Sequence, residues 1–189
     1  MKYHIYSIAF FFSLLVSGTS YCQTSTHADD LLYYTTIALQ MKEITPKVQS
    51  FWGELRQSIM TATENGNHKL DESKISNLKD DLRNNENELD RKIRMIGSLD
   101  ETDKDLNLKQ IIITYLTEAK SLEENSVPKV IQFLDKGIDK LNEQEKQVLK
   151  LFIMKGEELS SKSRNLQSIS MAYRGKHNIT NAELDKYGL

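Results

Sequence analysis

The chain of 189 residues contains one cysteine, two prolines and one tryptophan. The scarcity of cysteine and of proline limits the folds that the chain can adopt. The single cysteine, Cys22, excludes an internal disulfide, so packing alone must stabilise the fold. Two prolines and eight glycines leave few positions for turns, which favours long helices. A net charge of −2, without a basic stripe and interleaved aromatic residues, excludes the usual surface of a nucleic-acid-binding protein.

One apolar run, Ile5–Val16, follows a short polar start that contains Lys2 and His4. The run is too short to span a bilayer comfortably, and the residues after it are small or polar. We therefore predict that residues 1–22 are a signal peptide. The mature protein is then exported, to the periplasm or to the cell surface and extracellular space.

Cleavage after Ser20 and cleavage after Cys22 both fit the small-x-small rule. The alternative is a lipoprotein in which Cys22 is acylated as the first mature residue and anchors the protein to the outer membrane. Tyr21 is not the small residue that a lipoprotein signal has before its cysteine, so ordinary secretion is favoured. We expect membrane contact only if Cys22 is lipidated.

Residues 23–189 form one predicted all-α domain with helices at about 28–64, 71–97, 103–136 and 142–175. The last helix is the clearest, because Asn142 and Glu145 make a capping box and Gly175 is typical of a left-handed helix end. Its hydrophobic seam carries Val148, Phe152, Leu159, Leu166 and Tyr173. In the helix 71–97, Asn85 falls on the seam, where it either fixes the register or lies at the edge and reaches water; the edge position is favoured.

Two prolines fall inside predicted helices. Pro46 either breaks the helix 28–64, with Thr45 as a new N-cap, or kinks it. The apolar phase continues through Pro46 without a slip, which favours the kink. Pro128 lies where the stripe of the helix 103–136 loses some phase, so that helix either kinks or splits there.

Four helices of similar length with short links are expected to pack as antiparallel neighbours in an up-down-up-down bundle. A long two-helix hairpin or an oligomeric coiled coil would show the same pattern and is the alternative. Motifs for bundle chemistry are missing: the sequence has no Glu-x-x-His, no Cys-x-x-Cys-His and no Gly-x-Ser-x-Gly. We predict no catalytic residue, no cofactor and no enzymatic activity.

One group of polar residues is a candidate metal site. In the predicted bundle, the start of the first helix, the second loop and the end of the last helix share one end, which brings together His27, Asp29, Asp30, Asp100, Asp103 and His177. Imidazole and carboxylate groups could hold a divalent ion, with His27, Asp100 and His177 as the named candidates. The favoured interpretation is that these residues are solvated helix caps. Among the aromatic residues, Trp52 is expected in the core and Tyr33 is the better candidate for an exposed contact.

The last predicted helix runs into Ala172-Tyr173-Arg174-Gly175-Lys176-His177-Asn178-Ile179. With an export signal and four heptad-patterned helices, this stretch resembles a group of uncharacterised bacterial surface proteins. The resemblance implies an exported helical bundle and supplies no catalytic residue. We therefore expect a non-enzymatic interaction module of the cell envelope that binds an unknown protein or envelope component. The alternative is a bundle that binds a small ligand or a divalent metal.

Overall fold

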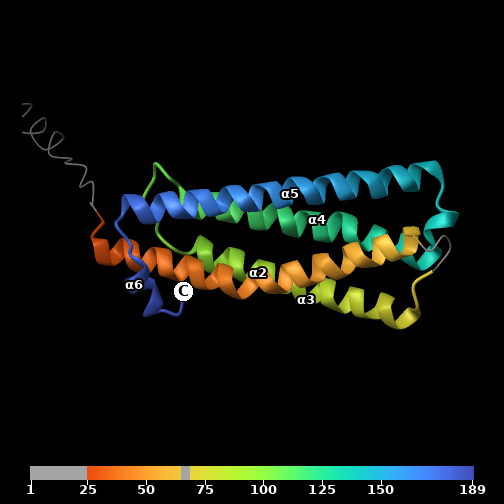
Figure 1. Ribbon diagram of the computed structural model, residues 1–189, viewed down its shortest axis with the longest axis horizontal. Coiled ribbons are helices and arrows are strands. Elements are labelled where there is room, and N and C mark those ends of the chain that lie inside the picture. The colour runs from red at the N-terminus through yellow and green to blue at the C-terminus, as the bar shows by residue number, and fades with distance from the viewer. Residues whose placement is uncertain (1–24, 65–68) are drawn as a thin grey trace, which may run out of the picture.

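The computed structural model describes residues 25–64 and 69–189, which are almost entirely helical (Figure 1). This part of the chain contains no strand, so the predicted all-α class is confirmed. Its elements are α2 (His27–Glu64), α3 (Glu72–Gly97), α4 (Leu108–Lys136), the 3₁₀ helix η1 (Ile138–Lys140), α5 (Glu143–Lys176) and α6 (Asn181–Asp185). The predicted signal peptide, Cys22 and His68 lie outside the described residues.

The four long helices lie side by side, and each packs against the next one in the chain. Their buried faces form two hydrophobic clusters rather than one continuous core. The first cluster is built around Phe51, Leu82, Leu134 and Phe152. The second is built around Tyr33, Leu89, Leu116 and Tyr173. The clusters occupy successive lengths of the same helices, so a boundary layer crosses the molecule between them.

Both prolines lie inside unbroken helices. Helix α2 continues through Pro46 and α4 continues through Pro128. A proline removes one backbone donor, and near Pro46 the Thr45 hydroxyl donates to the Met41 carbonyl at 2.6 Å. Figure 1 shows α2 bending near its middle, as expected for an interior proline. A helix break at Pro46 and a split at Pro128 are therefore both wrong.

The N-terminal caps follow from local sequence. Asn142 Oδ1 accepts the Glu145 N–H at 2.9 Å, and Glu145 Oε2 accepts the Asn142 N–H at 2.8 Å, which is the predicted capping box. The predicted start of the third helix near residue 103 is wrong, because α4 begins at Leu108. Asp103 Oδ1 instead accepts the N–H groups of Asp105 and Leu106, and Asn107 adopts a left-handed conformation with φ of 48°. The local side-chain hydrogen bonds compete with the helix here.

The predicted end of the last helix near residue 175 is right to within one residue, but Gly175 does not take the left-handed conformation predicted for it. Helix α5 includes Gly175 and ends at Lys176, and Asn178 takes the left-handed conformation with φ of 55°. The chain then forms α6 and returns toward the start of α2 (Figure 1). Ile179 and Leu184 are buried in the second hydrophobic cluster, so this tail is part of the packed structure.

One residue predicted on the hydrophobic seam of the last helix, Val148, does not lie in the core. Val148 is 37 % exposed, and Leu149 is buried in its place. Both precede Phe152 by about one turn, and the core lies on the side of Leu149. Phe152, Leu166 and Tyr173 are buried as expected, and Leu159 is partly buried.

Candidate functional sites

The polar residues predicted to share one end of the molecule do meet there. Asp30 lies near the start of α2, Asp103 lies in the loop between α3 and α4, and Lys176 and His177 end α5. We call these four residues the end cluster. Both aspartate side chains are nearly buried, with 7 % and 3 % of their surface exposed. The end cluster thus joins three segments that are far apart in sequence.

His177 is the centre of the end cluster. Its Nδ1 lies 2.7 Å from Asp30 Oδ2, and its Nε2 lies 2.9 Å from Asp103 Oδ2. Each ring nitrogen of His177 therefore has a carboxylate oxygen as its hydrogen-bond partner. Neither ring nitrogen is then free to take a proton from a substrate.

Asp103 accepts more hydrogen bonds than any other residue of the end cluster. Burial by itself would raise its pKa, but hydrogen bonds from Lys176, His177 and the backbone N–H groups of Leu106 and Asp105 outweigh burial. They hold the pKa of Asp103 well below its usual range. Lys176 Nζ lies 2.8 Å from Asp103 Oδ2, so the carboxylate is shared between two cationic side chains.

His27 lies next to the end cluster but binds different groups. Its Nε2 lies 2.8 Å from Glu183 Oε1, and its Nδ1 lies 3.0 Å from the His177 carbonyl oxygen. The hydrogen bond with Glu183 raises the pKa of His27 and helps lower that of Glu183 to about 2. His27 therefore holds α6 against the start of α2.

The tyrosines beside the end cluster were not recognised from the sequence. Tyr33, expected to be exposed, is buried, and its hydroxyl donates to Glu101 at 2.5 Å. Tyr173 is fully buried, stacks on His177 at 4.3 Å and hydrogen-bonds Thr102. Burial raises the pKa of both tyrosines well above the usual range, so their hydroxyls stay neutral. Tyr173 lay on the predicted seam, but a stripe position does not reveal what its hydroxyl will bind.

These contacts give no support to a metal site. Of the predicted candidates, Asp100 is exposed, while His27 and His177 use both ring nitrogens within the protein. Asp29 caps α2 through Thr26, as its spacing predicts. Over residues 25–64 and 69–189, no group of three or more His, Cys, Asp or Glu side chains is placed to hold a metal ion. The end cluster is therefore better described as a structural element that holds three chain segments together.

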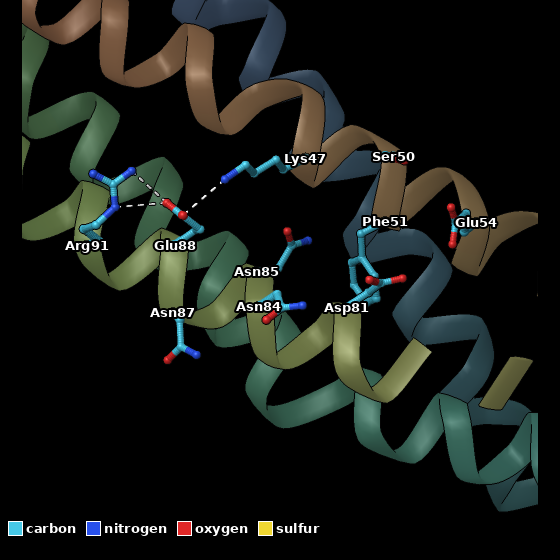
Figure 2. Close-up of a pocket in the computed structure, with 10 residues that line it drawn as sticks. All are labelled: Lys47, Ser50, Phe51, Glu54, Asp81, Asn84, Asn85, Asn87, Glu88 and Arg91. Carbon is cyan, nitrogen blue, oxygen red and sulfur yellow. Dashed lines mark hydrogen bonds and ion pairs between the residues drawn. The ribbon is translucent and has the colours of Figure 1, made fainter. Parts of the chain in front are cut away.

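A second candidate site is a groove between α2 and α3 with a volume of about 680 Å³ (Figure 2). Its α2 wall consists of Lys47, Ser50, Phe51 and Glu54, and its α3 wall consists of Asp81, Asn84, Asn85, Asn87, Glu88 and Arg91. Phe51 is buried, and the other nine lining residues are polar or charged. The two cations of the lining, Lys47 and Arg91, both pair with Glu88, at 3.1 and 2.9 Å. The groove therefore presents amide and carboxylate groups more than positive charge.

Asn85 lies between the two helices that form the groove walls (Figure 2). It is 5 % exposed, so the alternative in which it reaches water at the edge of the stripe is wrong. Its Nδ2 has no hydrogen-bond partner within the described part of the chain. A buried amide donor without a partner is costly, which makes Asn85 the unusual residue of this groove.

The fold and these sites define an all-α helical-bundle protein with a polar groove on one side. Comparison with known proteins gives no matching family model, no matching curated protein and no matching solved structure. Among the helices of the described residues, none is both long and apolar enough to cross a membrane.

Proposed function

We propose that the protein is an exported, non-enzymatic binding module of the cell envelope that binds a neutral glycan in the groove between α2 and α3. The proposed export rests on residues 1–22, whose apolar run and small, polar end have the pattern of a signal peptide. The proposed scaffold is an up-down-up-down four-helix bundle. In its favour, Lys47 pairs with Glu88 while the earlier Glu43 pairs with the later Lys92, so residue numbers rise along α2 as they fall along α3.

The observation that carries the proposal is the polar groove with the unpaired Asn85 amide between its walls. Binding sites combine a concave surface with a few convergent polar groups. Asn84 and Asn87 add exposed amides, and Glu54 and Asp81 add carboxylates. A sugar hydroxyl both donates and accepts a hydrogen bond, so adjacent hydroxyls match amide and carboxylate side chains.

The charges and the lining disfavour other ligands. An anionic ligand would compete with Glu88 for Lys47 and Arg91. A peptide ligand usually places side chains in apolar pockets, whereas the only apolar residue of this lining is the buried Phe51. A neutral glycan requires neither a free cation nor an apolar pocket.

The experiment measures binding of chito-oligosaccharides to the mature protein by calorimetry, with the double variant Asp81→Ala/Asn84→Ala. Both substitutions remove groove hydrogen bonds without touching the hydrophobic clusters. The loss of two or more hydrogen bonds should weaken binding by about tenfold or more. The matched control is Glu157→Ala/Asn165→Ala, which removes one carboxylate and one amide from exposed positions on α5.

Unchanged affinity in the groove variant, or equal weakening in the control, would contradict the groove as the binding site. Binding of unrelated extended peptides in place of the sugar would contradict the glycan assignment. Release of reducing sugar from the oligosaccharide during the measurement would contradict the non-enzymatic role.

A further inference from the structure

Two buried polar residues, Glu123 of α4 and Asn85 of α3, lie near the boundary between the two hydrophobic clusters. Glu123 is fully buried, with 0 % of its surface exposed. The first cluster ends near Leu82 and Phe152, and the second begins near Leu89 and Leu116. On α3, Asn85 falls between Leu82 of the first cluster and Leu89 of the second. On α4, Glu123 directly follows Leu122 and so lies at the edge of the first cluster; neither polar residue belongs to a cluster. The boundary layer therefore contains a buried carboxyl group beside a buried amide.

The hydrogen bonds of this layer are incomplete. Trp52 Nε1 donates to Glu123 Oε1 at 2.9 Å. Glu123 Oε2 and Asn85 Nδ2 both lack a partner of normal geometry among the described residues. Asn85 nevertheless lies close enough for its amide to lower the pKa of Glu123, an effect smaller than that of burial. An unpaired acceptor and an unpaired donor thus lie close to each other.

The charges around Glu123 leave it without a cation. Trp52 faces it from α2, Asn85 and Glu86 face it from α3, and Tyr115 of α4 lies near it with Ser163 of α5 beside the Tyr115 hydroxyl. No ion pair to Glu123 occurs within residues 25–64 and 69–189. The other deeply buried charge, Lys92, by contrast binds both Glu43 and Gln40. Burial without a cation raises the pKa of Glu123 to about 7, where small changes in pH alter its charge.

Asn85 links this carboxyl group to the groove, because the same side chain lines the groove and adjoins Glu123. We infer, on the basis of the proposed function, that proton binding by Glu123 regulates ligand binding in the groove by turning the Asn85 amide. Ionised Glu123 needs a donor, so it holds Asn85 Nδ2 and leaves the amide oxygen toward the groove. Protonated Glu123 needs an acceptor for its O–H, so it holds Asn85 Oδ1 and leaves the amide N–H₂ toward the groove.

The consequence is a groove with two hydrogen-bonding forms. Proton uptake replaces an acceptor between the groove walls by a donor, without moving a helix. A ligand whose hydroxyl is fixed in one direction would bind one form better, so its affinity would depend on pH. One hydrogen bond gained or lost corresponds to about a two- to tenfold change in affinity.

The first experiment needs no ligand and uses isotope-labelled mature protein titrated from about pH 5 to 9 by NMR. The Glu123 carboxyl carbon, the Trp52 indole N–H and the Asn85 side-chain amide should all shift with one midpoint. Glu123→Gln keeps a neutral side chain of the same shape, and in this variant the Trp52 and Asn85 signals should stay fixed. The matched control is Glu124→Gln, which changes the adjacent exposed carboxylate and should titrate as the wild type does. A Glu123 signal that titrates while the Asn85 amide does not move would overturn the inference.

The second experiment measures chito-oligosaccharide affinity at two pH values on either side of the observed midpoint. The wild type should change by the two- to tenfold factor given above, and Glu123→Gln should not change. Equal wild-type affinity at both pH values would overturn the inference and leave the proposed function standing. Joint titration of Glu123 and Asn85 with no sugar binding at either pH would support the proton coupling and overturn the glycan assignment.

Discussion

Asp103 shows how a single side chain can hold two distant segments together, the loop between α3 and α4 and the end of α5. It accepts hydrogen bonds from Lys176, His177 and two backbone N–H groups of its own loop. Buried polar groups stabilise a fold only when their hydrogen bonds are made. Asp103 is well satisfied, whereas Asn85 and Glu123 are not. This contrast separates the structural end cluster from the layer that we propose to be regulatory.

We expect Asp103→Asn to lower the free energy of unfolding by about 1.5–3 kcal/mol, because hydrogen bonds to a charged acceptor are lost. Urea unfolding of the variant at neutral pH measures the change. Asp105→Asn is the matched control, since Asp105 is exposed and contacts only the partly exposed Lys176 at 3.3 Å. The control should change stability by about 0.5 kcal/mol or less. Equal effects of the two substitutions would contradict a role for the buried carboxylate.

At the scale of the helices, the buried stripe of each helix determines which side-chain truncations lower the free energy of unfolding. Leu89 of α3 is 0 % exposed and belongs to the second cluster, whereas Val148 of α5 is 37 % exposed. Val148 was predicted to lie on the seam of the last helix, but its exposure places it outside the core, whereas Leu89 is a core residue. Leu159 is partly buried and should give an intermediate loss.

Leu89→Ala should cost about 2–5 kcal/mol of unfolding free energy, because it removes buried methyl groups and leaves a cavity. Val148→Ala should change stability by about 0.5 kcal/mol or less, as surface substitutions usually do. Chemical denaturation of both variants gives the two values under one condition. A loss near zero for Leu89→Ala would show that the second cluster is not a packed core.

At the scale of the whole molecule, titrating groups act on stability in opposite directions. The pKa of Glu123 is raised to about 7 in the folded state, above its unfolded value of about 4.3. Between these values the folded protein binds more protons than the unfolded chain, so stability falls as pH rises. The pKa of Asp103 is lowered, so its contribution is present above an unfolded value of about 3.9 and is lost as pH falls through the lower folded value. The pKa of His27 is also raised, so His27, like Glu123, makes stability fall as pH rises.

Stability should therefore be highest at about pH 4 to 5 and should fall by the order of 3 kcal/mol between there and pH 8, mainly through Glu123. Urea midpoints measured across this range check the prediction. Glu123→Gln removes the titrating group, so most of the fall above pH 5 should disappear in that variant. A wild-type profile that is level from pH 5 to 8 would show that Glu123 does not titrate in this range.

Helix caps could be predicted from the sequence because their interactions are local. Asn142 with Glu145 caps α5 as predicted. Asp71 with the Lys74 N–H and Thr26 with Asp29 show the same three-residue spacing at the starts of α3 and α2. The start of α4 could not be predicted, because the side chain of Asp103 competes with the helix for backbone donors. The predicted end near Gly175 was right to within one residue, but the left-handed residue after the helix is Asn178 rather than Gly175.

The sequence by itself determined the all-α class, the four long helices and the gathering of His27, Asp30, Asp103 and His177 near one end. These follow from periodicity, caps and short links, which act over a few residues. Only the tertiary structure decided the roles of those residues, the burial of Tyr33 and the placement of Asn85 next to Glu123. The physical reason is that desolvation and hydrogen-bond satisfaction depend on which helices meet. A glutamate that appears to be an ordinary solvated residue in the sequence becomes, in the fold, a buried acid next to the groove.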